Sequence, residues 1–197
     1  HDAKGCLIAA IRDNNPVVFV EHRLLYSTDA PVPEDPYTVD FGKARVVGEG
    51  TDITLVGISY MLVECLAARE LLAEAGISAA VIDPVSLLPL DVGTFAESAG
   101  RTGRLLVVDN AWVTCGAGAE IVAAVCERRE GASPLAVGRM GYAPTTCPTT
   151  PALEKGFYPN AATIASKAHS IVRPDDPPWT PDVEPTLPHE TAFRGPF

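Results

Sequence analysis

The chain has 197 residues, of which 47% are hydrophobic and 20% are charged, a composition typical of a folded globular protein. Fifteen Lys and Arg against 25 Asp and Glu give a net charge of −10, which argues against binding nucleic acid or an anionic membrane surface through a basic patch. The sequence also has no apolar run approaching the roughly 20 residues of a membrane span.

The first 26 residues are predicted to be the trailing helix and strand of another domain. Residues 2–12 carry Leu7, Ile8 and Ile11 on one stripe, which indicates an amphipathic helix that ends before Pro16. Residues 16–21 are a continuous apolar run of strand length, typical of a strand buried on both faces in a parallel sheet. A lone helix and strand cannot bury these faces, so we expect the rest of their sheet to come from elsewhere.

A segment rich in Pro and Asp, residues 27–42, is predicted to be a linker, and a regular alternation follows it. Strands are expected at 51–59, 78–83, 104–109 and 135–140. Helices are expected at 60–75, 89–99, 116–129 and 160–172, with Asp91 as an N-cap. This order predicts an α/β domain over residues 43–173, with three layers and a mostly parallel five-stranded sheet.

The last 24 residues, 174–197, form a Pro-rich tail with seven prolines. One interpretation is an extended, solvated segment. The other is docking on the domain surface through large side chains, at Trp179, Leu187, Phe193 and Phe197.

The end of the first helix is the sharpest candidate site. A helix C-terminus leaves backbone carbonyls unpaired and carries a partial negative charge, so Asp13 beside them makes an oxygen-lined seat for a hard cation. The alternative is an Asp-Asn turn before Pro16 with solvated side chains.

Other motifs give no catalytic constellation. The segment Gly116–Glu120 lacks the third glycine of a dinucleotide fingerprint, and close helix packing explains it better. The four histidines do not cluster, and His22 is interpreted as a structural or interface residue. Five scattered cysteines form no C-x-x-C pair or metal-ligand spacing, which favours a reducing compartment, the cytoplasm or alternatively the mitochondrial matrix. From these motifs alone we do not expect the chain to be a complete enzyme.

Five ordered blocks together resemble one protein family: residues 4–26, 31–59, 81–91, 102–121 and 151–160. They are similar to the beta subunit of the decarboxylating component of 2-oxo-acid dehydrogenase complexes, a group in the transketolase superfamily that covers the pyruvate, branched-chain and acetoin enzymes. The resemblance implies that residues 1–26 end a pyrimidine-binding domain and that residues 43–173 form a transketolase C-terminal-type domain.

The resemblance also implies the cofactors. Thiamine diphosphate and Mg would be bound by the assembly and not by this segment, because the family's catalytic histidine and cofactor-activating glutamate match no residue here. We therefore assign no catalytic and no cofactor-binding residue. In the pyruvate members a potassium ion lies at the end of the first helix, and the matching positions here are Ala10, Ile11, Asp13 and Asn15.

The implied partners are an alpha-type subunit, a pyrimidine-domain region and a second beta-type subunit in a heterotetramer, with an acyltransferase core as a further candidate. The expected function is therefore structural and subunit assembly within a 2-oxo-acid dehydrogenase. Two alternatives are a noncatalytic docking module for the acyltransferase core and part of a transketolase-like carboligase. Departures from the family pattern at Cys115–Glu120 and Thr145–Thr150 leave the substrate open.

Overall fold

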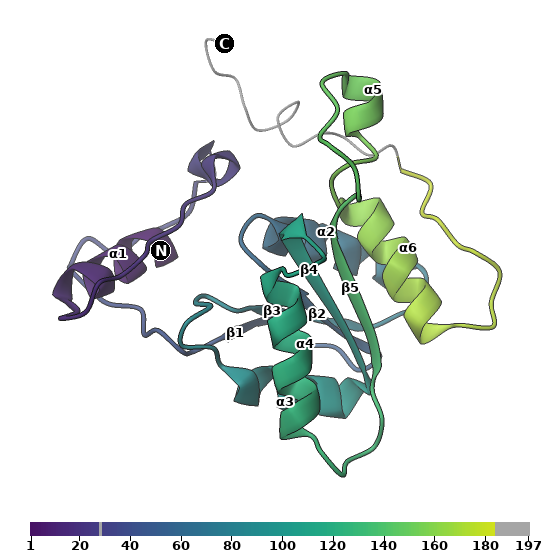
Figure 1. The fold of residues 1–197 in the computed structure, drawn as a ribbon, viewed down its shortest axis with the longest axis horizontal. Coiled ribbons are helices and arrows are strands. Elements are labelled where there is room, and N and C mark those ends of the chain that lie inside the picture. The colour runs from purple at the N-terminus through teal and green to yellow at the C-terminus, as the bar shows by residue number, and fades with distance from the viewer. Residues whose placement is uncertain (28, 184–197) are drawn as a thin grey trace.

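The computed structural model describes residues 1–27 and 29–183, and its centre is one twisted five-stranded sheet (Figure 1). The strands lie in the order β1-β3-β2-β4-β5, and all neighbours are parallel except β1, which runs antiparallel to β3. Their bounds are β1 Arg45–Gly48, β2 Ile53–Gly57, β3 Ala79–Asp83, β4 Arg104–Trp112 and β5 Ala136–Tyr142.

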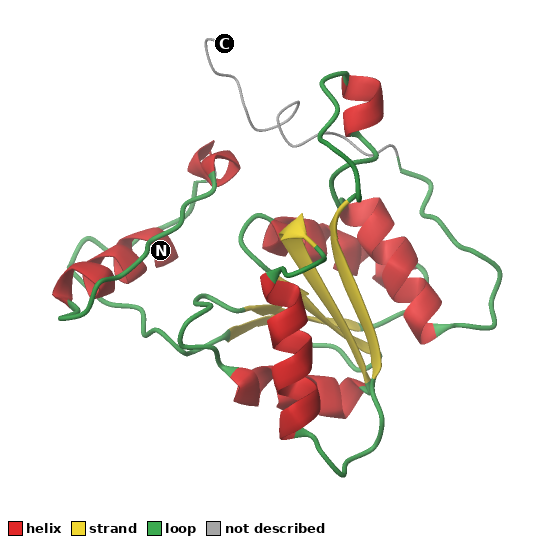
Figure 2. Ribbon diagram, viewed as in Figure 1, coloured by secondary structure: helices red, strands yellow, loops and turns green. Residues whose placement is uncertain are grey.

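Helices cover both faces of this sheet, which confirms the predicted three-layer α/β fold (Figure 2). Helices α2 (Met61–Glu74) and α6 (Ala161–Val172) pack on one face, and α3 (Val92–Thr102) and α4 (Ala117–Arg128) on the other. Side chains of β4 alternate between the layers: Leu106 and Val108 face α2 and α6, whereas Leu105 and Val107 face the opposite pair. Both faces of the central strands are therefore buried, as their unbroken apolar sequences predict.

The N-terminal arm, residues 1–27, differs from the expected elements at two places, residues 16–21 and residues 23–27. Helix α1 (Asp2–Arg12) forms as expected, and a short 3-10 helix, η1 (Arg23–Ser27), ends the arm. Residues 16–21 pair with no strand among the described residues, and Val18 and Val20 are 88% and 85% exposed. Because their partner strands were expected to come from elsewhere, the strand stays a prediction. A strand needs backbone partners, and the sheet of this chain ends at β1 and β5 instead.

Two elements were not predicted individually. Strand β1 supplies the fifth strand that the expected sheet required, and as a half-exposed edge strand it carries a weak sequence signal. Helix α5 (Pro151–Glu154) is a single turn that begins at a proline and extends away from the sheet (Figure 1).

The described part of the tail docks on the domain. Trp179 stacks on His169 of α6 with ring centroids 5.0 Å apart, and Pro181 is buried. Docking is thus the correct alternative for Trp179, whereas Leu187, Phe193 and Phe197 lie outside the described residues.

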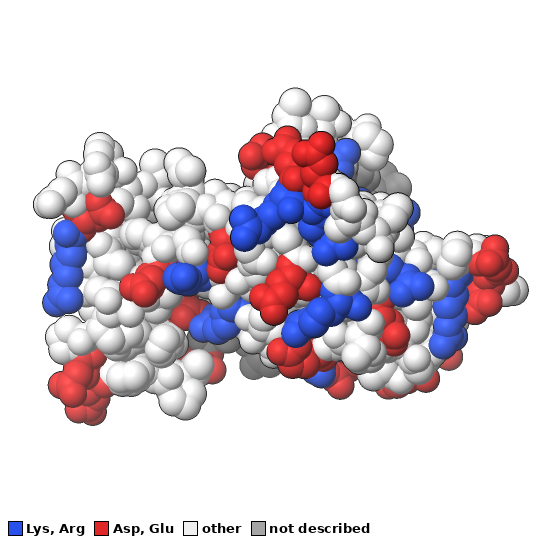
Figure 3. Space-filling model, turned by 90° about the horizontal axis from the view of Figure 1, so that it is seen from below, with Lys and Arg blue, Asp and Glu red and all other residues white. Residues whose placement is uncertain are grey.

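Surface properties agree with the composition. Over residues 1–27 and 29–183, no helix is both long enough and apolar enough to span a bilayer. On the face drawn in Figure 3, acidic and basic side chains are interspersed and do not gather into a basic stripe.

Candidate functional site

The predicted cation seat lies at the exposed end of α1. The backbone N–H of Asp13 closes the helix by donating to the carbonyls of Ala9 and Ala10, at 3.0 and 3.4 Å. The Asp13 carboxylate turns toward Asn15, accepting hydrogen bonds from its backbone N–H at 2.8 Å and its side-chain amide at 2.9 Å. The backbone hydrogen bond from Asn15, aided by the side-chain bond, lowers the pKa of Asp13 and so keeps the carboxylate ionised.

The chemistry of this donor set fits a weakly held monovalent cation. It comprises one ionised carboxylate and the last carbonyls of a helix, which is a hard oxygen set. The structure brings Asp13 and Asn15 together, and Ala10 and Ile11 lie in the adjoining last turn of α1. The described part of the chain contains no group of three or more His, Cys, Asp or Glu side chains that could hold a metal ion. The charged side chains of Arg12, Asp40 and Lys43 line the same surface hollow as Asp13.

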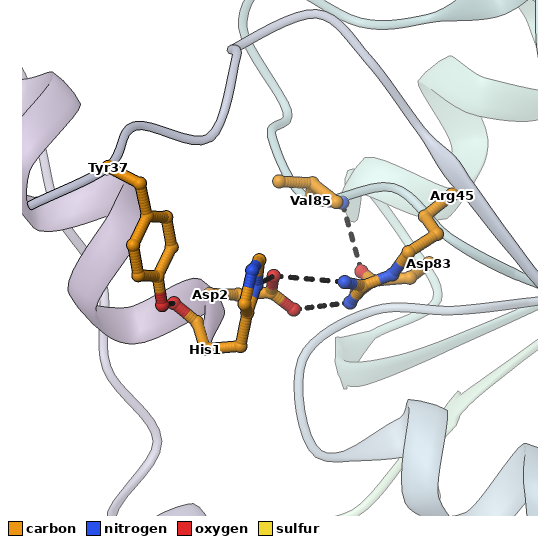
Figure 4. Close-up of polar contacts among 6 residues, drawn as sticks. All are labelled: His1, Asp2, Tyr37, Arg45, Asp83 and Val85. Atoms are coloured by element: carbon orange, nitrogen blue, oxygen red, sulfur yellow. Dashed lines mark hydrogen bonds and ion pairs between the residues drawn. The ribbon is translucent and has the colours of Figure 1, made fainter. Parts of the chain in front are cut away.

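Helix α1 is anchored to the edge of the sheet by a polar cluster (Figure 4). Arg45 of β1 forms ion pairs with Asp2 of α1 and with Asp83 of β3, the latter at 3.0 Å. The hydroxyl of Tyr37 donates to the carbonyl of His1 at 2.6 Å, while Lys4 donates to three linker carbonyls between Pro33 and Asp35. These contacts fix one end of the arm.

The other end of the arm lies at the carboxyl edge of the sheet. The chain leaves β2 toward β3, while β4 lies on the opposite side of β2, so the ends of β2 and β4 flank the topological switch point where open α/β sheets usually bind ligands. His22 reaches both strands: its Nε2 is 2.6 Å from the side-chain nitrogen of Asn110 in β4, and its ring stacks on Tyr60, which follows β2. This confirms His22 as a structural contact residue.

Two further carboxyl groups lie near this edge. Glu64 of α2 accepts a hydrogen bond from the backbone N–H of Ala161 at 2.8 Å and so caps the start of α6. Burial raises the pKa of Glu64 and, on the opposite face of the sheet, that of Asp109. Burial and the neighbouring Glu64 raise the pKa of Tyr60 to about 12.

The segment Gly116–Glu120, at the start of α4, packs as the sequence predicts. A Cβ at Gly118 would lie 3.3 Å from the Val107 side chain, so close packing of α4 on the sheet explains this glycine. Cys115 is exposed with a φ of 58°, a left-handed conformation that is uncommon outside glycine.

An aromatic cluster at the ends of β4 and β5 was missed from the sequence. Its members, which come from strands and loops far apart in the chain, are Trp112, Tyr142, Phe157 and Tyr158. Tyr142 stacks on Phe157 at 4.9 Å, and Trp112 meets both rings edge-on. The only available signal was the aromatic pair at 157–158 beside one of the segments that depart from the family pattern.

Comparison with known families and structures gives consistent matches. The family model described as "Transketolase, C-terminal domain" matches residues 42–164. A structure titled "Split gene transketolase, inactive beta4 tetramer" has a TM-score of 0.61 at 28% identity, covering 72% of this chain and 46% of that one.

Curated relatives extend the match into the arm. The "Acetoin:2,6-dichlorophenolindophenol oxidoreductase subunit beta" of Cupriavidus necator is 40% identical over 173 residues, which cover 88% of this chain and 51% of the relative. The "Pyruvate dehydrogenase E1 component subunit beta" of Staphylococcus aureus is 43% identical over 85% of this chain and 52% of its own length. The protein of that name from Bacillus subtilis is 40% identical, with 87% and 53% covered. The chain thus spans about half the length of these relatives.

Proposed function

Because the chain belongs to the transketolase C-terminal domain family, we propose that it is the C-terminal part of a beta-type subunit of a thiamine diphosphate-dependent 2-oxo-acid dehydrogenase. The observation that carries this proposal is the 40–43% identity to beta subunits of pyruvate and acetoin enzymes across 85–88% of the chain. Such coverage reaches beyond the matched domain and into the arm.

In this proposal the chain contributes structure and subunit contacts. The sheet domain presents the carboxyl edge of its strands, and the arm holds out the exposed apolar residues Val18 and Val20 for strands of a pyrimidine-domain region. An alpha-type subunit and a second beta-type subunit complete a heterotetramer. Thiamine diphosphate and Mg are assigned to other polypeptide regions. In this chain Arg45 positions the arm, and Asp13 contributes to the cation seat.

A reconstitution tests the proposal. The chain is mixed with an alpha-type subunit and a polypeptide carrying a pyrimidine-binding domain, and 2-oxo-acid-dependent reduction of 2,6-dichlorophenolindophenol is followed with thiamine diphosphate and Mg present. We expect reduction only when all three polypeptides are present, with pyruvate and branched-chain 2-oxo acids compared to define the substrate. If the chain binds neither polypeptide and adds nothing to the rate, the proposal is wrong.

A second candidate is part of a transketolase-like carboligase, and the observation that favours it is the similarity to a split-gene transketolase at a TM-score of 0.61. The same mixture distinguishes the two reactions when an aldehyde acceptor replaces the oxidant. A carboligated product without dye reduction would favour the carboligase. Binding of an acyltransferase core without either reaction would favour the docking module.

A further inference from the structure

At the η1 end of the arm, the imidazole of His22 makes the polar contacts with the sheet domain. His22 is the polar residue of the arm that reaches both strands of the switch point, through Asn110 on one side and the ring of Tyr60 on the other. Beside it, Leu24 and Leu25 pack against the core cluster under α2. Residues 22–25 therefore lie at the carboxyl edge between β2 and β4, the place where open α/β sheets usually bind ligands.

The hydrogen-bond geometry favours a neutral imidazole. The Asn110 side-chain nitrogen lies 2.6 Å from Nε2, and with the amide in this orientation it donates to the tautomer that carries its proton on Nδ1. Nδ1 is buried, and within the described residues it has no hydrogen-bond partner. Protonation would turn Nε2 into a donor facing another donor and would place a charge on a half-buried ring whose Nδ1 has no described partner. Turning the amide to offer its oxygen would relieve only the first of these costs.

The groups that contact the ring are the Tyr60 phenol, which stays neutral over the physiological range, and the Asn110 amide. The flanking residues Glu21 and Arg23 are exposed, and Glu21 accepts a hydrogen bond from Tyr26. Glu64 of α2 interacts with the Tyr60 hydroxyl and with the backbone N–H of Ala161, and Asp109 lies near Gly116 at the start of α4. No described hydrogen bond or ion pair joins the imidazole to a carboxylate.

We propose that His22 is a pH-sensitive latch: the neutral imidazole docks residues 22–25 at the switch point between β2 and β4, and the protonated imidazole releases them. Burial lowers the pKa of His22 below its ordinary value, so docking is at full strength above about pH 6.5 and weakens as the pH falls through the lower docked value. The latch depends only on contacts within this chain, so it stands or falls independently of the reaction proposed above.

Hydrogen exchange of the full chain tests the latch. Backbone protection of residues 22–25 is measured at about pH 7.5 and about pH 5, after correction for the intrinsic exchange rate. We expect opening of this segment to increase at low pH, by at most about tenfold per pH unit, as the uptake of one proton dictates. Protection of β2 and β4 should change little, since they belong to the core.

Three variants sharpen the test. His22→Gln keeps an acceptor for Asn110 but cannot titrate, so protection should be the same at both pH values. Asn110→Asp places a carboxylate beside the ring and should reverse the response, so that low pH tightens docking. His169→Gln, which alters a buried histidine in contact with Trp179, should leave the response of residues 22–25 unchanged.

A wild-type chain whose arm is equally protected at both pH values would overturn the proposal. So would an undiminished pH response in His22→Gln. If His22→Gln fails to fold, the reversed response of Asn110→Asp decides the question, because general acid destabilisation would open the arm of that variant as well.

Discussion

Asp13 both ends helix α1 and supplies the carboxylate of the candidate cation seat. It closes α1 through its backbone N–H and binds Asn15 through its carboxylate, so two local interactions fix its position without any tertiary contact. Its pKa is lowered by the same hydrogen bonds, and it therefore remains charged at neutral pH beside helix carbonyls that repel it. A bound cation would remove that repulsion.

We predict that Asp13→Asn abolishes stabilisation by potassium. Asparagine still offers an oxygen to Asn15, so the turn is kept while the charge is removed. In about 100 mM potassium chloride against choline chloride, the wild-type Tm should rise by about 1–3 °C, as expected for a weak site, and the variant should show no rise. Asp29→Asn, an exposed linker residue, is the control. An equal rise in Asp13→Asn would contradict the seat.

Helix α3 shows how one cap can serve two elements. The Asp91 carboxylate accepts hydrogen bonds from the Thr94 backbone at 3.2 Å and the Thr94 hydroxyl at 2.7 Å, and also from the backbone of Ala44 just before β1. Burial opposes ionisation of Asp91, but these hydrogen bonds outweigh it and lower its pKa. The cap therefore ties the start of α3 to the edge strand.

We predict that Asp91→Ala lowers the free energy of unfolding by about 1–2 kcal/mol, measured by urea denaturation, because α3 loses its cap. Asp91→Asn should cost less, since an amide oxygen also caps. The advantage of the wild type over Asp91→Asn should be present above about pH 4 and should disappear as the pH falls through the lowered pKa. Equal stability of wild type and Asp91→Ala would show that the cap is dispensable.

The whole molecule consists of a domain whose sheet is buried between helices and an arm that is partly exposed. The arm is held at α1 by Arg45 and Tyr37 and at η1 by His22, while the segment between these anchors exposes Val18 and Val20. Apolar side chains this exposed on an extended segment mark a surface for association. In the proposed assembly this surface pairs with strands of the pyrimidine-domain region.

We predict that Val18→Lys leaves the stability of the isolated chain within about 0.5 kcal/mol, because the side chain is already in solvent. The same variant should fail to copurify with a pyrimidine-domain polypeptide, since the charge would be buried at the new interface. Val18→Thr, which keeps β-branching, is the matched control. Copurification of Val18→Lys at the wild-type level would exclude this segment from the interface.

The parts of the fold predicted from the sequence are those set by local pattern. Continuous apolar runs predicted the central strands β2, β3 and β4, because burial on both faces leaves a clear sequence pattern. Of the two exposed edge strands, β5 was predicted as the next strand in the alternation with helices, whereas β1, only four residues long, was missed. In the candidate site, the hydrogen bonds from Asn15 to Asp13 match the Asp-Asn turn, which was predicted because its geometry is local, and the cation seat stays a prediction.

The features that could not be predicted from the sequence depend on contacts between residues far apart in the chain. The sequence by itself determined the sheet domain, the cap at Asp91 and the apolar character of residues 16–21. Only the tertiary structure decided that those residues lie exposed, that Trp179 docks on His169, and that His22 meets a residue 88 positions away. The physical reason is that an apolar run specifies a need for burial but not the partner that satisfies it, and the partner is fixed only when distant segments pack together.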